Sequence, residues 1–257
     1  MDDQSGILVA MLAAGDRVAI GARRNDGNGC DLGHVRIYDW NGSTWNQAGQ
    51  DIDGEATNDL SGWSVAMSAA GNRVAIGTYL NDGRGGVDSG HVRIYDWSTS
   101  SWTQVGGDID GETSNDWSGF SVAMSADGNR VAIGAIGNGV QSGHVRIYDR
   151  SNSLWTQAGG AIDGETTADS PVVSVVMSAD GKRFAIGAKS SYSDRIGTYP
   201  GHVRVFDWNN VSHCLLQAKL WAPSLVCPLC LLQAKLQAPT PMCPLHLLPS
   251  HLSLPNP

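Results

Sequence analysis

The sequence predicts an all-β protein made of repeated, four-stranded antiparallel sheets. The tetrapeptide Gly-His-Val-Arg occurs four times, and its first glycines are 57, 53 and 58 residues apart. Between these landmarks lie short runs of β-branched and aromatic residues, bounded by Gly, Asn, Asp and Ser, which favour strands and turns. No part of the repeat shows the period of an amphipathic helix. The four tetrapeptides begin at Gly33, Gly90, Gly143 and Gly201.

The chain divides into a body of four copies, residues 4–210, and a tail. The first three copies are complete, and the fourth breaks off near Asn210, where its last strand should begin. Residues 211–257 hold eight of the ten prolines, four of the five cysteines and no acidic residue. We therefore expect an irregular, low-complexity tail without structure. The copies are residues 5–60, 61–117, 118–170 and 171–210.

The second copy shows the expected order of strands most clearly. Its first two apolar runs are joined by the turn Ala-Ala-Gly-Asn, which is a signal for a hairpin. The third run alternates strictly, so Val92 and Ile94 are expected on one face and Tyr95 and Trp97 on the other. The four expected strands are residues 64–68, 73–77, 91–97 and 102–105.

Four short antiparallel strands repeated at a fixed period are typical of the blades of a β-propeller. In such an array each blade packs on its neighbours through both faces, so the polar face must also be covered. The segment Val35–Asp39 is similar to the third strand of a WD-repeat blade. That family is disfavoured because its blades run about 40–45 residues, which is shorter than the period here.

The segment Ile109–Ala123, followed by Arg130–Ala135, resembles the FG-GAP repeat of integrin-alpha-type propellers. The shared features are an Asp shortly before an aromatic/Gly pair, the run Ser-Val-Ala, and a hairpin that ends in Gly-Ala. Ser61–Ala66 with Gly77 repeats the pattern, and weaker copies occur in the first and fourth repeats. The resemblance implies a propeller with a role in binding or adhesion at a cell surface.

The family's propellers usually contain more blades than this chain can form. We therefore expect either a small closed ring of four blades or, as the preferred interpretation, a fragment of a larger surface protein. The chain begins directly in the repeat with no basic segment ahead of an apolar one, so no signal peptide is expected. If the array is open, its unpaired strand edges could associate edge to edge with another copy.

Composition excludes several classes of partner. The net charge of -8 argues against a nucleic-acid-binding protein, which needs a basic face for phosphates. No stretch reaches the roughly 18 apolar residues of a membrane helix. Cys30 is the single thiol of the body, so no internal disulfide can form there. A protein or glycan partner remains.

The acidic linkers between copies are the main candidates for a metal site. In the first two linkers the carboxylates fall at relative positions one, three, five and nine, and oxygen ligands at odd loop positions are how Ca²⁺ sites are built. Calcium is thus the one candidate cofactor. The alternative is that Asp59, Asp116 and Asp169 cap backbone amides at the turn between blades. The candidate ligands are Asp51, Asp53, Glu55, Asp59, Asp108, Asp110, Glu112 and Asp116.

A histidine begins the third strand of every copy. Because the four histidines occupy equivalent positions in different blades, we expect them to lie apart and not to converge on one catalytic or metal site. We interpret them, and the Arg and Asp repeated in every third strand, as residues that serve the blade itself. The histidines are His34, His91, His144 and His202.

The copies differ most in the loop between the second and third strands. Variable loops on a rigid scaffold are where recognition is usually found, although simple sequence drift in the loops is an equal alternative. The candidate partner contacts are Tyr79, Tyr192, Arg195 and Tyr199.

The sequence contains no G-x-S-x-G elbow, no P-loop and no H-E-x-x-H motif. We therefore predict a non-catalytic binding module that presents its loops to a protein or glycan. The alternatives are a propeller enzyme, a hydrolase or lyase with its site in the central channel, and a non-functional gene fragment. The tail's Cys227-Pro-Leu-Cys230 has the inner spacing of a zinc knuckle, but the outer cysteines are not paired in the same way, so zinc is not expected.

Overall fold

The computed structural model describes residues 3–26, 30–137, 143–164, 172–188, 201–209 and 213–221, the last of these as backbone alone. Within these ranges the chain forms nineteen β-strands and no helix. No helix that could cross a membrane is therefore found there. The all-β, repeated architecture expected from the sequence is confirmed.

Each of the four copies forms one sheet, which we call a blade. Blade 1 consists of β1 (Ser5–Met11), β2 (Arg17–Ala22), β3 (His34–Trp40), β4 (Trp45–Gln47) and β5 (Ile52–Asp53). Blade 2 consists of β6 (Ser64–Met67), β7 (Arg73–Thr78), β8 (His91–Ser98), β9 (Ser101–Gln104) and β10 (Ile109–Asp110).

The other two blades follow the same plan. Blade 3 consists of β11 (Ser118–Met124), β12 (Arg130–Ala135), β13 (His144–Ser151), β14 (Leu154–Gln157) and β15 (Ile162–Asp163). Blade 4 consists of β16 (Val172–Met177), β17 (Arg183–Ala188), β18 (His202–Asn209) and β19 (His213–Trp221).

The four main strands of a blade pair antiparallel in chain order, as predicted. The structure adds a short fifth strand in the first three blades. In blade 1 it pairs with the start of β3, through His34 with Asp53 and Val35 with Ile52. The segment Asp-Ile-Asp-Gly-Glu, which the sequence marks as a linker, is therefore part of the sheet. Its isoleucine is buried in each of these three blades, which fixes the segment against the third strand.

Blade 4 is completed beyond the boundary predicted at Asn210. Strand β19 pairs with the full length of β18, from His213 opposite Asn209 to Trp221 opposite His202. The outer edge of β18 exposes unpaired backbone groups, and any extended segment can satisfy them whatever its side chains. The repeat pattern is lost in the sequence at this point, but the sheet continues. Residues 222–257, predicted to be irregular, lie outside the described residues.

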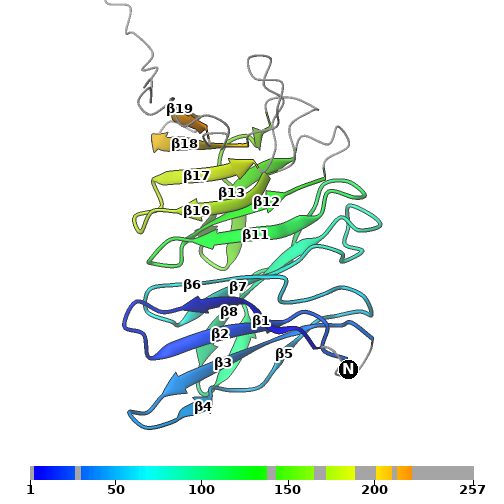
Figure 1. The fold of residues 1–257 in the computed structure, drawn as a ribbon, viewed down its shortest axis with the longest axis vertical. Helices are drawn as coiled ribbons and strands as arrows, with labels where there is room; N and C mark the ends of the chain where they lie inside the picture. Colours follow the sequence, from blue (N-terminus) through cyan, green and yellow to red (C-terminus); the bar gives the residue numbers. More distant parts are fainter. Residues whose placement is uncertain are drawn as a thin grey trace, which may run out of the picture.

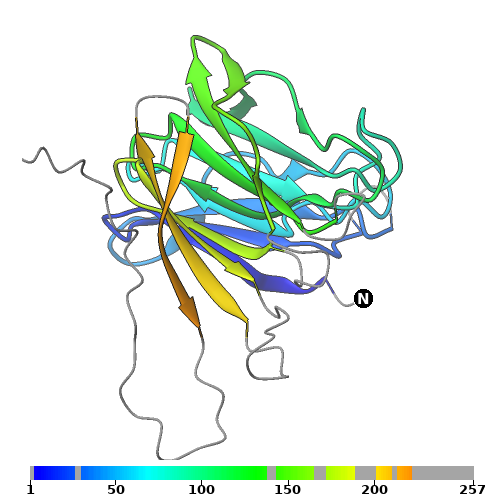
Figure 2. The same ribbon diagram turned by 90° about the horizontal axis from the view of Figure 1, so that it is seen from above.

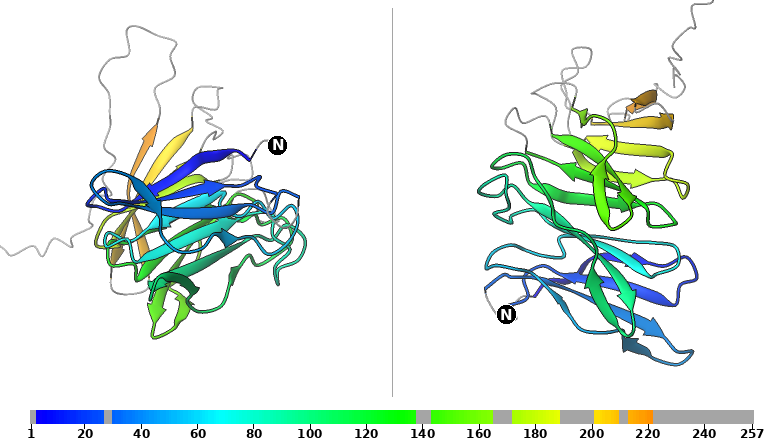
Figure 3. Two further views of the ribbon diagram at one scale, coloured as in Figure 1. Left: turned by 90° about the horizontal axis from the view of Figure 1, so that it is seen from below. Right: turned by 180° about the vertical axis from the view of Figure 1, so that it is seen from behind.

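The blades stack in chain order, with blade 1 at one end and blade 4 at the other (Figure 1). Figure 2 views the stack along its length, and Figure 3 shows the same order of blades from behind. The first strands of successive blades contact each other: β1 with β6, β6 with β11, and β11 with β16. They therefore form a common side of the stack.

An apolar cluster fills each of the three contacts between blades. Between blades 2 and 3, Val92 and Ile94 of β8 pack with Val131 and Ile133 of β12. The opposite face of β8 contributes Tyr95 to the cluster between blades 1 and 2. The alternation predicted for residues 91–97 is confirmed, and it gives every inner blade two buried faces.

Glycine is required where the backbones of two blades touch. Gly77 in β7 lies against the carbonyl oxygen of Gly119 in β11, so close that a Cβ would collide with it. Gly21 in β2 meets Gly62 of the next blade in the same way. The glycine of the repeated Ala-Ile-Gly motif thus allows neighbouring sheets to approach backbone to backbone.

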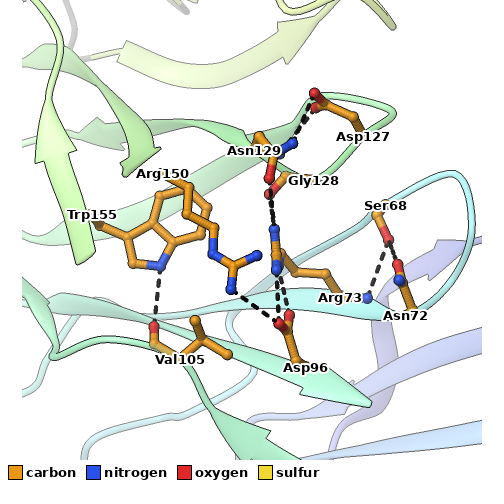
Figure 4. A network of polar contacts seen from close by, with 10 residues as sticks. All are labelled: Ser68, Asn72, Arg73, Asp96, Val105, Asp127, Gly128, Asn129, Arg150 and Trp155. Carbon is orange, nitrogen blue, oxygen red and sulfur yellow. Dashed lines mark hydrogen bonds and ion pairs between the residues drawn. The ribbon is translucent and has the colours of Figure 1, made fainter. Parts of the chain in front are cut away.

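A repeated arginine forms the main polar contact between blades (Figure 4). Arg73 donates from Nε and Nη2 to the two carboxylate oxygens of Asp96, at 2.5 and 2.7 Å. Its Nη1 donates to the carbonyl oxygen of Gly128 in blade 3 at 2.8 Å. Trp155 of blade 3 lies beneath the guanidinium and donates from its indole to the carbonyl oxygen of Val105 at 3.1 Å. One side chain therefore links its own blade to the next.

Substitution of Gly77 by alanine should lower the free energy of unfolding by about 2 kcal/mol, because the backbones of blades 2 and 3 must separate to admit the methyl group. Gly107→Ala is the matched control, since no atom lies within 4 Å of its added Cβ. Its effect should stay below about 0.5 kcal/mol. Urea denaturation of the two variants measures the difference, and equal stabilities would contradict the proposed close approach.

Arg73→Leu should lower the free energy of unfolding by about 3 kcal/mol. The substitution leaves the Gly128 carbonyl without this donor, and it leaves Asp96 facing only Arg150 at 3.6 Å among the described cations. Arg24→Leu removes an exposed arginine and should change stability by less than about 0.5 kcal/mol. A thermal melt followed by circular dichroism compares the two, and a small loss for Arg73→Leu would show that apolar packing alone holds the blades.

Candidate functional site

A cavity of about 730 Å³ opens between blades 1 and 2, where the loops of both blades meet. Its walls are residues 55–59, which follow β5, the loop 80–88 between β7 and β8, and two residues at β10. One of the described residues that line it is basic, Arg84, and six are acidic. The acidic residues are Glu55, Asp59, Asp82, Asp88, Asp108 and Asp110.

Asp59 connects the linker after β5 to the loop between β7 and β8 by hydrogen bonds. Its carboxylate accepts from the backbone N–H of Ala56 at 2.9 Å and from the side-chain amide of Asn81 at 2.9 Å. Asp116 repeats the first contact in the next linker, accepting from the N–H of Glu112 at 2.7 Å. The alternative role expected from the sequence, the capping of amides at the turn between blades, is confirmed for both residues, and Asp169 lies outside the described residues.

The negative charge of the cavity is not fully compensated. Burial raises the pKa of Asp110, and the neighbouring Asp108 raises it further. Burial likewise raises the pKa of Asp88, with a smaller contribution from Asp82. Arg84, the one basic residue among the described residues that line the cavity, lies 3.9 Å from Asp110 and is almost fully exposed, and Arg93 pairs with Glu55 at 3.2 Å. A cationic group placed in the cavity would therefore gain from several carboxylates at once.

His91 lies behind the cavity wall, at the start of β8. Its side chain is 1% exposed, and burial followed by the charge of Arg93 lowers its pKa to about 4, so the ring is neutral at pH 7. One ligand atom each of Glu55, His91 and Asp108 lies within 4.8 Å of the others. Within the described part of the chain, His91 Nε2 has no hydrogen-bond partner.

One neutral imidazole with two carboxylates is a donor set for a divalent transition metal more than for Ca²⁺, which prefers oxygen ligands alone. Both carboxylates already have protein partners. Arg93 pairs with Glu55 at 3.2 Å, and Gln104 donates to Asp108 at 2.7 Å. A metal ion would have to displace these contacts, so the group is a possible ligand set and not a preformed cage.

The sequence analysis missed this convergence. The histidines do lie in different blades, but each of the first three meets carboxylates of the linkers. The other two groups are His34, Asp51 and Asp53, and Glu112, Asp116 and His144. The signal that could have revealed it is the pairing of the linker with the third strand, which sets Asp110 opposite His91.

Within each linker the structure brings together only some of the predicted calcium ligands, Asp51 with Asp53 and Glu112 with Asp116, each beside a histidine. In the first linker Asp51 is held by Arg36 through two hydrogen bonds of 2.9 and 2.7 Å, and Arg36 lowers its pKa. Asp53 converges with it only at His34. In the second linker Glu112 pairs with Arg146 at 3.2 Å. The structure instead brings Glu55 and Asp59 of one linker and Asp108 and Asp110 of the next to one cavity. Calcium binding stays a prediction.

The predicted partner contacts are placed only in part. Tyr192, Arg195 and Tyr199 lie outside the described residues. Tyr79 is half-buried, and its ring lies 4.4 Å from that of Trp63 and 5.6 Å from that of Phe120 between centroids. Its ring thus packs in an aromatic cluster next to the cavity loop, and its contact with a partner stays a prediction.

No known protein family matches the sequence, and no curated protein is significantly similar to it. Solved structures share its fold. A protein described as a 6-phosphogluconolactonase from Bacteroides uniformis superposes with a TM-score of 0.56 at 12% identity, over 84% of this chain and 54% of that chain. A protein of the same description from Bacteroides fragilis gives 0.55 at 10% identity, over 83% and 54% of the two chains.

TolB from Acinetobacter baumannii gives a TM-score of 0.48 at 15% identity, over 82% of this chain and 43% of that chain. The two Bacteroides proteins are β-propellers, so the predicted β-propeller fold is confirmed. At such identities the likeness concerns the fold alone. The chain spans about half the length of the solved structures that it resembles. The FG-GAP resemblance stays a prediction.

Asp110→Asn should stabilise the protein at neutral pH. The pKa of Asp110 is raised above its ordinary value of 3.8, so the folded protein favours the protonated carboxyl and carries a penalty when it is ionised. The gain in melting temperature should be largest near pH 7, should shrink as the pH falls through the raised pKa of the folded state, and should vanish well below pH 3.8, where the carboxyl is protonated in both states. Asp16→Asn, on an exposed hairpin, is the control with no expected gain. A loss of stability at pH 7 for Asp110→Asn would contradict the excess negative charge.

Proposed function

We propose that this propeller is a non-catalytic binding module that holds a basic segment of a protein partner in the acidic cavity between blades 1 and 2. The observation that carries the proposal is the cavity itself, which is lined by six acidic residues from two linkers and one loop and by one basic residue, the exposed Arg84. Its volume of about 730 Å³ is enough for one or two long side chains.

The electrostatics favour a cationic ligand over a neutral one. Asp88 and Asp110 carry raised pKa values because their charges are partly buried beside other carboxylates. A lysine or arginine side chain would relieve this cost and would be steered toward the cavity by its field. A neutral glycan would leave the carboxylates uncompensated, so of the two partner classes expected from the sequence the protein partner is the better match.

The walls of the cavity are held in place before any ligand arrives. Asp59 fixes Asn81 of the loop to the linker, and Asn81 donates from its backbone N–H to the carbonyl oxygen of Thr78 at 3.3 Å. The loop closes through Gly90, whose N–H donates to the carbonyl oxygen of Asn81 at 2.9 Å. A preorganised wall loses little conformational entropy on binding.

The test is the binding of a fluorescent peptide of alternating lysine and glycine to the full chain, followed by fluorescence anisotropy with a chelator present throughout. The double variant Asp88→Asn/Asp110→Asn should bind at least tenfold more weakly, because two of the carboxylates that face the cation become neutral. The chelator ensures that a bound metal ion does not contribute to the signal.

The control variant Asp16→Asn/Asp163→Asn removes the same number of charges outside the cavity and should bind as the unmodified chain does. Equal affinity of the two double variants, or equal binding of a peptide in which glutamine replaces lysine, would overturn the proposal. Binding that weakens with added salt in the unmodified chain is expected for a charged contact.

A further inference from the structure

The outer face of blade 1 carries apolar side chains that are more exposed than their buried or partly buried counterparts in blade 2. Val65 and Met67 of blade 2 pack against the cluster between blades 1 and 2. Their counterparts in blade 1 are Val9 and Met11, and Val9 is 59% exposed. The same shift from buried to half-buried or exposed holds for the rest of that face. These other residues are Val18, Ile20, Tyr38, Trp40 and Trp45.

The outer face of blade 4 corresponds to the face of blade 1 that packs against blade 2. In blade 1 the buried residues that face blade 2 include Val35 and Ile37. Their counterparts in blade 4 are Val203 and Val205, and Val203 is 37% exposed. Val176 on β16 is also exposed. The two end faces of the stack are thus the two sides of the contact that the chain makes three times within itself.

The polar groups at the two ends of the stack are also complementary, with a hydrogen-bond donor on blade 4 and a matching acceptor on blade 1. Arg17, Arg73 and Arg130 each donate from Nη1 to a hairpin glycine of the following blade. Arg183 is next in this series. Its Nε and Nη2 bind Asp207, its side chain is 65% exposed, and its Nη1 has no partner among the described residues. The corresponding acceptor at the other end of the stack is the carbonyl group of Gly15, on the exposed hairpin of blade 1.

Backbone hydrogen bonds between the hairpins run in the same direction, because the hairpin of each blade donates an N–H to the hairpin of the following blade. The N–H of Ala69 donates to the carbonyl oxygen of Ala126 at 2.9 Å, and that of Ala126 donates to Ala179 at 2.9 Å. Ala13 donates to Ala69 at 3.3 Å and so begins the series. The N–H of Ala179 therefore stands at the donor end, and the carbonyl group of Ala13 stands at the acceptor end.

An aromatic pair on blade 1 completes the match. In blade 2 the rings of Trp97 and Trp102 lie 5.1 Å apart, and the guanidinium of Arg17 from the preceding blade lies 5.0 Å from the first of them. In blade 1 Trp40 and Trp45 form the same pair at 5.5 Å on the outer face. An arginine in the position of Arg183 would cover this pair as Arg17 covers its own.

We propose that blade 4 of one copy of this chain docks on blade 1 of a second copy, head to tail. The second copy is the occupant that the surfaces specify, because donors lie at one end of the chain and matching acceptors and tryptophans lie at the other. Two like ends would oppose donors to donors or acceptors to acceptors. This chain covers 54% of a solved propeller of the same fold, and in the proposed complex two copies joined at both ends would form a closed array.

Analytical ultracentrifugation of the full chain over a range of concentrations tests this. The unmodified chain should sediment as two copies. Val9→Glu on blade 1 and Val203→Glu on blade 4 should each raise the dissociation constant at least a hundredfold, because each places a carboxylate in an apolar contact. Leu154→Glu, at a side chain that is 67% exposed on β14, is the matched control and should leave the pair intact.

A mixture of the two variants separates head-to-tail docking from other arrangements. Val9→Glu keeps an intact blade 4 face and Val203→Glu keeps an intact blade 1 face, so the mixture should recover a two-chain complex through one contact. Circular dichroism melting checks that each variant folds. Arg183→Gln, which leaves both apolar faces unchanged, gives a second blade 4 variant with an expected tenfold loss.

Three results would overturn the proposal. The first is an unmodified chain that sediments as a single copy at all concentrations. The second is a pair whose dissociation constant is unchanged by both Val203→Glu and Arg183→Gln but raised by Val9→Glu, which would indicate contact between two blade 1 faces. The third is a mixture of the two Glu variants that stays monomeric although both are folded.

Discussion

The contact between successive blades is the constraint on which this structure depends. A single four-stranded sheet has two apolar faces and cannot bury either of them by itself. The chain solves this by repeating one sheet and by making the same contact at each junction. Gly77 lets the backbones meet, and Arg73 satisfies a carbonyl group of the next blade while its charge is held by Asp96. The arginine repeated at this position in the first three blades makes the same contact at each junction.

Function therefore has to be sought where the junctions differ. The cavity between blades 1 and 2 is one such place, because it is formed by the long loop 80–88 and by linkers of two different blades. The corresponding loop of blade 3 is shorter, and the third linker has Ala161 where the others have an aspartate. The same scaffold can thus carry an acidic hollow at one junction without repeating it at the next.

The exposed groups at the two ends of the stack are also explained by the contact between successive blades. A contact that has a direction, with donors on one side and acceptors on the other, leaves one unsatisfied half at each end of any open array. In this chain those halves are Arg183 on blade 4 and the tryptophan pair Trp40 and Trp45 on blade 1. The proposed binding in the cavity and the proposed closure of the array use different surfaces, so the two proposals can be tested separately.

From the sequence alone we could predict the four main strands of the first three blades and the turns between them, because hydrophobic alternation and turn residues act between neighbours in the chain. The sequence also allowed the capping role of Asp59, whose partner Ala56 is three residues away. Only the tertiary structure decided that the acidic linker is a strand and that β19 completes blade 4. It alone placed Glu55 beside His91 and gave Arg73 a partner in Gly128, 55 residues along the chain. Such contacts depend on how one sheet lies on the next, and no local pattern of residues specifies that geometry.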